Sequence, residues 1–264
     1  MDTKGITVLL FCVSVGMIEG NKEREGDCVM LIDLHGHTKG ISRCCRLYAP
    51  EVLAAAEEAG LDGICLCNHY QMCYVPDGDA LAFAHRYIDE FRATRAIGEE
   101  MGVRVFFGIE VTMNRHRDEH ILVYGVDEQF PLQYPALYEL TQQELYERVH
   151  AAGGVMVQAH PMRKGKNLLM DPVYLDGVEV NCHPKYDRTY AEEMAKLAKS
   201  NNWILTCGGD YHADTHRVQC GVYLPDHIAN GVLLGQYLKQ AEVLRLRVQE
   251  VGEMTAYDME YKKY

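Results

Sequence analysis

The sequence predicts an α/β fold, a (β/α)7 barrel with seven parallel strands inside and helices outside. Three observations lead to this prediction. Short apolar runs alternate with helix-like segments along most of the chain, as they do in βαβ units. Polar residues gather at the ends of these runs, where such barrels carry their sites. The 264 residues, 48% of them hydrophobic, are enough for the core of one such domain.

The expected strands are short apolar runs of the length that buried strands usually have. They cover residues 31–34, 63–67, 103–109, 120–124, 155–159, 177–180 and 203–207. Helices are expected between them, and Pro50 and Gly60 mark the start and the end of the first one. The expected helices cover residues 50–60, 79–101, 141–152 and 189–201, with a C-terminal helix at 232–248.

Residues 30–264 are expected to form the single barrel domain, and residues 1–29 a leader. The uncharged run 5–18 resembles the apolar region of a signal peptide, with a weak cleavage site at Ser14-Val15-Gly16. It is too short for a comfortable transmembrane helix. The favoured alternative is a non-native extension ahead of Met30, because the ten cysteines show no zinc-finger spacing and are typical of buried, reduced thiols. We therefore expect a cytoplasmic protein without a membrane anchor.

The charge of the chain limits its partners. It has 26 basic and 38 acidic residues, a net charge of -12. Such a balance argues against binding to a nucleic-acid backbone, which needs clustered Lys and Arg. A small phosphorylated substrate, including a nucleotide, remains compatible because bound metal ions can dominate a local field.

Two histidines, His35 and His37, stand one residue apart at the end of the first expected strand. Side chains at i and i+2 of a strand point the same way, so both imidazoles face one point. Further imidazoles and carboxylates follow at the ends of later strands, except His120, which opens one: His69, Glu110, His120, His160, Asp210 and His212. Such donors suit Zn, Mn or Fe, and a carboxylate can bridge two ions. The pattern predicts a site for divalent metals at the C-terminal ends of the strands.

Five stretches in this order resemble the PHP (polymerase and histidinol phosphatase) superfamily: 33–38 (DLHGHT), 63–69 (GICLCNH), 108–110 (GIE), 159–161 (AHP) and 209–212 (GDYH). The resemblance implies a distorted seven-stranded barrel, up to three metals and phosphoester hydrolysis. It also implies a first metal held by His35, His37, Glu110 and Asp210. Glu110 would bridge to a second metal, completed by His120 and His160. His69 and His212 would hold the third.

The third position departs from the family pattern, which usually adds an Asp or His shortly after the H-x-H pair. Residues 39–45 contain neither, and Ser42 offers only a neutral hydroxyl. Cys44 or Cys45 is a possible thiolate ligand, although packing in the loop is the commoner role of a cysteine. A second departure is Asn68, where the family usually has Asp. We expect two tightly bound ions and a third that is loose or missing.

Other polar residues receive secondary roles. Arg163 and Lys166 are candidates for gripping a phosphate, and His212 for protonating the leaving alkoxide. Glu179 and His183 are candidates for the surroundings of the site. The remaining histidines are expected on the surface: His85, His116, His150, His216 and His227.

The function these observations favour is metal-dependent hydrolysis of a small phosphorylated molecule, as in histidinol-phosphate or nucleotide phosphatases. Divalent metals lower the pKa of a water ligand to about 7, so hydroxide is available at neutral pH. One alternative is an amidohydrolase-like enzyme acting on a C–N or lactone bond, although no expected strand ends in the bridging lysine typical of that class. Another is a non-catalytic metal-binding regulatory module. The substrate, the native metal and the oligomeric state are not encoded in any motif.

Overall fold

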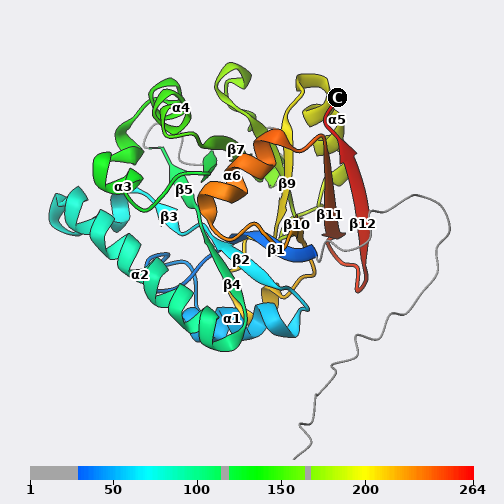
Figure 1. Cartoon of the computed structure of the whole chain (residues 1–264), viewed down its shortest axis with the longest axis horizontal. Helices are drawn as coiled ribbons and strands as arrows, with labels where there is room; N and C mark the ends of the chain where they lie inside the picture. The colour runs from blue at the N-terminus through cyan, green and yellow to red at the C-terminus, as the bar shows by residue number, and fades with distance from the viewer. Residues whose placement is uncertain (1–28, 114–118, 164–167) are drawn as a thin grey trace, which may run out of the picture.

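Helices surround two β-sheets in the computed structural model, which describes residues 29–113, 119–163 and 168–264 (Figure 1). The leader predicted at 1–29 lies outside the described residues except for Val29, as do His116 and Lys166. The chain has a mixed α/β fold, which confirms the predicted class. No described helix is long and apolar enough to span a bilayer.

The first sheet has the order β12-β11-β10-β1-β2-β4. Strands β1, β2 and β4 are parallel, whereas β10 runs antiparallel to β1 and continues into the antiparallel pair β11 and β12. The bounds are β1 (Val29–Gly36), β2 (Gly63–Leu66), β4 (Arg104–Phe107), β10 (Gly221–Pro225), β11 (Val243–Gln249) and β12 (Ala256–Lys262).

The second sheet has the order β3-β5-β6-β7-β8-β9. Its parallel pairs are interrupted by β6, which is antiparallel to both β5 and β7. The expectation of an all-parallel sheet was therefore wrong at β6, and β10 is an antiparallel strand that was not predicted. The bounds are β3 (His69–Tyr70), β5 (Ile109–Thr112), β6 (His120–Tyr124), β7 (Val155–Ala159), β8 (Gly177–Asn181) and β9 (Ile204–Gly208).

Helix signals in the sequence mark the observed helix ends well. The Asp79 side chain accepts the Ala82 N–H at the start of the longest helix, and Gly102 ends it with a φ of 76°. Thr141 and Glu144 form a capping box on a later helix. The helices are α1 (Ala49–Glu58), α2 (Ala80–Met101), α3 (Phe130–Gln133), α4 (Gln142–Ala151), α5 (Ala191–Asn201) and α6 (Gly231–Gln240). Short 3-10 turns cover Met72–Tyr74, Pro76–Gly78, Leu137–Glu139, Pro172–Tyr174 and Asp214–His216.

The strand expected at 103–109 is interrupted at Gly108, which separates β4 from β5 and passes the chain from the first sheet to the second. A Cβ atom at position 108 would lie 2.5 Å from Cys67 Sγ and 2.8 Å from Cys65 Sγ. Only glycine fits this approach without moving the neighbouring strand. The two sheets also meet through a bridge between Gly36 and Tyr211. A closed ring of seven strands is not shown by the strand pairing of the described residues.

The helix expected at 232–248 was also wrong in its second half. Helix α6 ends at Gln240, and the following residues form strand β11, which pairs with β12. Leu244, Leu246 and Val248 are buried on one face of β11. Arg245 and Arg247, on the other face, each lie 2.7 Å from a carboxylate oxygen of Asp258. This alternation has the period of a strand, which the apolar content of the segment obscured.

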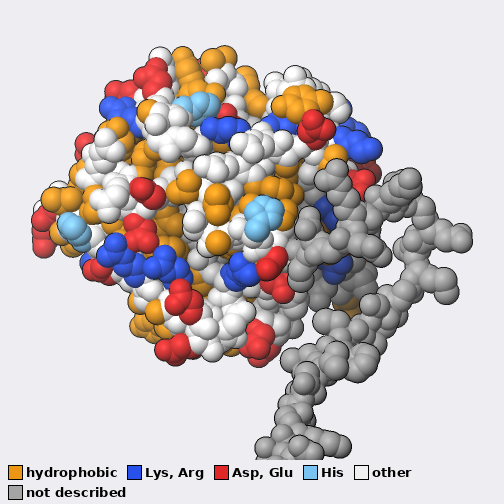
Figure 2. Space-filling view, viewed as in Figure 1, with side chains coloured by type: hydrophobic (Ala, Val, Ile, Leu, Met, Phe, Trp, Pro, Cys, Tyr) orange, Lys and Arg blue, Asp and Glu red, His pale blue; other side chains and the backbone are white. Residues whose placement is uncertain are grey.

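The core fills the space between the sheets and the helices, and it includes most of the described cysteines. Cys65 and Cys67 are fully buried, as predicted, and all eight described cysteines are free thiols. On the face seen in Figure 2, basic side chains lie beside acidic ones rather than in one broad patch. Among the described residues, Arg92 and Arg95 both pair with Glu128.

Candidate metal centre

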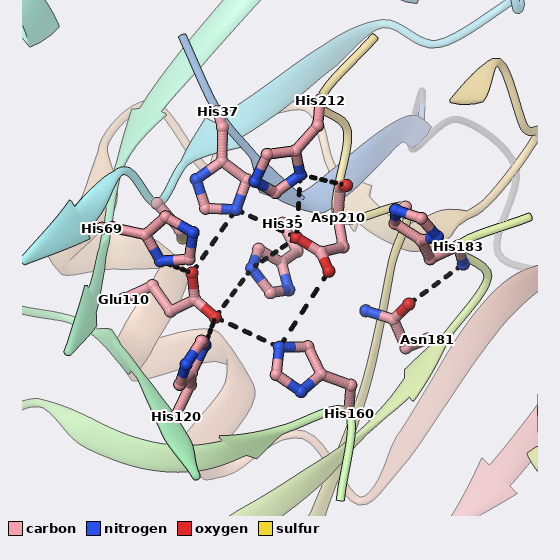
Figure 3. Close-up of polar contacts among 12 residues, drawn as sticks. His35, His37, His69, Glu110, His120, His160, Asn181, His183, Asp210 and His212 are labelled. Carbon is pink, nitrogen blue, oxygen red and sulfur yellow. Dashed lines mark hydrogen bonds and ion pairs between the residues drawn. The ribbon is translucent and has the colours of Figure 1, made fainter. Parts of the chain in front are cut away.

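The structure brings together all eight histidines and carboxylates that the sequence suggested as metal ligands. Figure 3 shows these side chains pointing toward one another around two carboxylates, Glu110 and Asp210. They come from both sheets and from the segments after β1, β7 and β9: His35, His37, His69, Glu110, His120, His160, Asp210 and His212. All are buried except His212, which is half-buried.

Strand register explains part of this convergence. His69 on β3 stands opposite Glu110 on β5, and His120 on β6 stands opposite Ala159, next to His160. His160 and Asp210 follow their strands with φ angles of 33° and 50°, where non-glycine residues are rare. Each such residue typically costs about 1–3 kcal/mol, and such strain gathers at functional sites.

Glu110 is fully buried within reach of five imidazoles. Its Oε1 lies 2.7 Å from His120 Nδ1 and 3.2 Å from His160 Nε2, and its Oε2 lies 2.5 Å from His69 Nδ1. His35 Nε2 lies 3.5 Å from Oε1, and His37 Nε2 lies 3.5 Å from Oε2. Burial by itself raises the pKa of Glu110, but the imidazoles around it, His69 first, hold that pKa well below its usual range. The carboxylate therefore stays ionised and offers its two oxygens to different sets of donors.

Asp210 is the second buried carboxylate. Its Oδ1 lies 3.1 Å from His37 Nε2 and 3.2 Å from His212 Nδ1. Its Oδ2 accepts the hydroxyl hydrogen of Tyr186 at 2.7 Å. Burial raises the pKa of Asp210, and the neighbouring imidazoles, with His212 first, outweigh burial and keep that pKa low. Nothing in the sequence around Tyr186 pointed to this contact.

Several buried polar atoms in the centre have no hydrogen-bond partner: His35 Nε2, His69 Nδ1 and Glu110 Oε2. His69 Nδ1 and Glu110 Oε2 are close enough for an ion pair but lack hydrogen-bond geometry. Leaving such groups unsatisfied costs about 1–3 kcal/mol each, and more for charged ones. These atoms face one another, as metal ligands do, so the donor set fits divalent metal ions.

Four groups of ligand atoms that include residues of the centre lie within 4.8 Å of one another: His35 with His37 and Asp210, His69 with Glu110 and His120, His37 with His69 and His212, and His183 with His212 and His216. The first group contains three of the four ligands that the resemblance implies for the first metal, all but Glu110. The second group differs from the second implied metal site, because it contains His69 in place of His160. Imidazole and carboxylate donors suit Zn, Mn and Fe alike, so the groups leave the metal open.

A second layer of hydrogen bonds orients the histidines. Glu179 Oε1 lies 2.7 Å from His35 Nδ1, and Glu179 Oε2 accepts the His160 N–H at 3.0 Å. Burial lowers the pKa of His35, but Glu179 and Glu110 raise it above the usual value. Glu179, a weak candidate in the sequence, thus supports two members of the centre at once.

Asp33 also belongs to this layer, although only its place in the first motif pointed to it. Its Oδ1 accepts the His35 N–H at 2.8 Å and the Gly209 N–H at 3.0 Å, tying β1 to the segment before Asp210. Burial raises the pKa of Asp33 to about 7.

Asn68 and Ser42 hold the other side of the centre. Asn68 Oδ1 accepts from the Thr38 N–H and the Ser42 hydroxyl, both at 2.8 Å. Ser42 Oγ lies 3.1 Å from His37 Nδ1 and accepts the His69 N–H at 3.0 Å. An ionised aspartate at this position could only accept hydrogen bonds, whereas the NH₂ group of Asn68 also donates to Thr38 Oγ1 at 2.9 Å.

The two candidate thiols, Cys44 and Cys45, lie in different surroundings. Cys45 is buried, and its Sγ faces the carbonyl oxygens of His37 and Leu47. Cys44 is exposed, and its Sγ lies 3.2 Å from His212 Nε2. Burial would raise the pKa of Cys44, but hydrogen bonds from His212 and His69 lower it to about 5.

Among the predicted surface histidines, His85, His150 and His227 are exposed, but His216 is buried. The turn Asp214–His216 folds back onto the centre, where His216 Nδ1 accepts the His212 N–H at 3.2 Å. Its ring also contacts His183, with centroids 4.2 Å apart. Burial, then His183, lowers the pKa of His216 to about 4. The surface prediction failed for His216 because local sequence does not show which turns fold over a site.

Arg163 lies close to the centre in sequence and in space. Its N–H donates to the His160 carbonyl at 3.0 Å, and it lines a small cavity together with His160, Glu179 and Tyr186. The structure thus places Arg163 beside the centre without showing its role.

The sequence matches no protein-family model, and no curated protein matches it either. Solved structures do resemble the chain. One is a two-domain protein from Bacteroides vulgatus that contains a predicted PHP-like metal-dependent phosphoesterase, at a TM-score of 0.57 and 13% identity over 89% of this chain and 87% of that one. Another is PsfC from Pseudomonas syringae, at a TM-score of 0.55 and 20% identity over 75% and 82%.

A third similar structure is an amidohydrolase from Chromobacterium violaceum with bound sulfate and no metal. It covers 74% of this chain and 92% of its own at 16% identity, and its TM-score of 0.49 is too low to support a conclusion. At these identities the likenesses establish the fold. The chain therefore has a PHP-like α/β fold, as its motifs indicated.

Proposed function

We propose that this protein is a metal-dependent phosphoesterase that hydrolyses a small phosphorylated substrate. The observation that carries the proposal is Glu110, a buried carboxylate whose two oxygens face different imidazoles within a PHP-like fold. The proposal includes two to three divalent ions, with Zn, Mn and Fe as candidates. It also includes a closed seven-stranded barrel, which the bridge between Gly36 and Tyr211 supports.

Glu110 would bridge two metals. Its Oε1 faces His120 and His160, which would hold the second ion, and its two oxygens each lie 3.5 Å from a ligand of the first ion, Oε1 from His35 and Oε2 from His37. The first ion would take His35, His37 and Asp210 in addition. His69 and His212 would serve a third ion beside His37.

The charges of the centre favour an anionic substrate although the whole chain is acidic. When bound, divalent ions supply an activated water at neutral pH and neutralise phosphoryl oxygens. Glu110 and Asp210 compensate only part of the charge of two divalent ions, because the other ligands are neutral imidazoles. The remaining positive charge would attract a phosphate, and Arg163 beside His160 would add a bidentate grip.

His212 has two proposed roles that exclude each other. Its Nδ1 contacts the Asp210 carbonyl oxygen at 2.7 Å, and its Nε2 faces Cys44. As a ligand of a third ion, Nε2 has no proton to give. With only two ions bound, the imidazolium would protonate the leaving alkoxide, consistent with Asp210 raising the pKa of His212 against the effect of burial.

The test begins with metal analysis of the purified protein. The chelated protein is then reconstituted with Mn, Zn or Fe(II) and assayed against phosphomonoesters, nucleotides, lactones and amides. The proposal predicts metal-dependent release of inorganic phosphate from at least one phosphomonoester. Turnover of lactones or amides alone would establish the amidohydrolase alternative. Stoichiometric metal binding without turnover of any substrate class would favour the regulatory module.

A further inference from the structure

The loop that follows the H-x-H pair returns to the metal centre and is anchored there. The Lys39 N–H donates to the Leu47 carbonyl at 2.7 Å, which closes the loop on itself. The Arg46 N–H donates to the carbonyl oxygen of His212 at 2.8 Å. This bond joins the loop to the backbone of a proposed metal ligand, two residues after Cys44. These two main-chain hydrogen bonds therefore restrain the loop that carries Cys44.

The proposed third metal position has two imidazoles and no carboxylate of its own, because Glu110, whose Oε2 lies 2.5 Å from His69 Nδ1, is the proposed bridge between the other two ions. The rings of His69 and His212 lie 5.6 Å apart between centroids, and both are within 4.6 Å of the His37 ring. Glu110 and Asp210 already serve the other two positions. Residues 39–47 contain no Asp, Glu or His, so a negatively charged ligand from this loop has to be a thiolate.

Of the two thiols in the loop, only one faces the third position. Cys45 Sγ lies 3.5 Å and 3.6 Å from the carbonyl oxygens of His37 and Leu47, on the inner side of the loop. Cys44 Sγ lies 3.2 Å from His212 Nε2 and 3.5 Å from the Tyr74 hydroxyl. A sulfur and a nitrogen on the same tetrahedral zinc are about 3.5 Å apart, given bonds of about 2.3 Å and 2.0 Å. A small outward shift of either side chain would thus admit an ion.

We infer that Cys44 is the third protein ligand, with His69 and His212, of the third metal position. This inference rests on the proposed function, since it completes the same centre. A set of two imidazoles and one thiolate favours zinc over manganese or magnesium. Three protein ligands leave the fourth position open, as in catalytic zinc sites. The thiolate also supplies the single negative charge that a carboxylate would have brought.

Cobalt reconstitution tests the inference directly, because thiolate bound to Co(II) gives a near-ultraviolet charge-transfer band that imidazole and carboxylate do not. We expect the wild type to bind three equivalents of Co(II) and to show the band. Cys44→Ser should bind two equivalents and lose the band. Cys45→Ser is the matched control within the loop, and Cys73→Ser controls for an exposed thiol elsewhere. Both should keep the band and the third equivalent.

A further variant, Cys44→His, guards against a folding defect in the serine variant. It should bind three equivalents without the band, because imidazole restores a ligand but not the sulfur. A wild type that binds two equivalents, shows no band and hydrolyses phosphoesters would overturn the inference and leave the proposed function standing. A band that survives in Cys44→Ser would also overturn it. A wild type that binds no metal would overturn both.

Discussion

The metal centre has a half built from strands and a half built from loops. The strand-built half holds His35, Glu110 and His120, which lie on β1, β5 and β6. The loop-built half holds Cys44 and His212, which lie after β1 and after β9. The first three are buried, whereas Cys44 is exposed and His212 is half-buried.

The difference between these halves lies in what fixes their geometry. In the strand-built half, the register of adjacent strands sets the spacing of the side chains, and Glu179 adds a second layer behind His35. In the loop-built half, spacing depends on a few main-chain bonds such as that from Arg46 to His212. We therefore expect tight metal binding in the first half and exchangeable metal in the second.

The largest effect should come from removing Glu110, the proposed bridging carboxylate. Glu110→Gln keeps the shape of the side chain but removes the charge proposed to hold two ions, so metal and activity should disappear together. Two metals stabilise the transition state by several kcal/mol, so the rate should fall by about 1000-fold or more. Metal analysis and phosphate-release assays would check this. Glu192→Gln on the exposed surface is the control, and unchanged metal content in Glu110→Gln would refute the bridging role.

A smaller effect is expected behind the strand-built half. Glu179→Gln removes the charge facing His35 Nδ1 and weakens the acceptor of the His160 N–H. Loss of such a partner typically lowers metal affinity about 10–100-fold. Competition titrations with a metal-binding dye would measure the change. Wild-type affinity in Glu179→Gln would show that strand register alone orients the two histidines.

A chelator should remove metal from the loop-built half before it removes metal from the strand-built half. A chelator added to the fully loaded protein should remove one equivalent first, from the side of Cys44 and His212, where solvent reaches the site. An affinity difference of at least about tenfold, or 1.4 kcal/mol, is expected between this ion and the other two. Stopped-flow release of zinc would resolve the phases. Simultaneous loss of all ions would mean that the centre is one cooperative unit.

The smallest effect should lie outside the centre, in the hairpin of β11 and β12. Asp258 pairs with Arg245 and Arg247, and although burial raises its pKa, these contacts lower it to about 2. A carboxyl with a lowered folded pKa stabilises the protein above its unfolded pKa of about 3.9 and loses that contribution as pH falls toward 2. Because the pair is largely solvent-exposed, Asp258→Asn should cost about 1 kcal/mol or less at pH 7.

Chemical denaturation of the metal-free protein at pH 7 and at pH 2–4 would measure this contribution. The difference between wild type and Asp258→Asn should shrink as the pH falls. Metal content should stay at the wild-type level in the variant, because the hairpin contributes no ligand. A loss of metal in Asp258→Asn would mean that the hairpin supports the centre.

The helix ends and most strands were predictable because their signals are local. Asp79, Gly102 and Thr141 act within one turn of the helices they cap, so neighbouring residues are sufficient to identify them. Predictions failed where the deciding contact is distant in sequence. Gly108, between two strands, packs closely against Cys65 and Cys67, and β11 pairs along its length with β12.

The motifs near the strand ends were enough to predict the eight histidines and carboxylates that meet at the centre, but not Tyr186 or His216, which contact Asp210 and His212. The sequence left Cys44 and Cys45 equivalent, as two adjacent thiols in a loop without strand or helix period. Only the tertiary structure separated them. Main-chain hydrogen bonds fix the loop so that one sulfur faces carbonyl oxygens and the other faces His212. Such bonds form between segments far apart in the chain, and no local pattern encodes them.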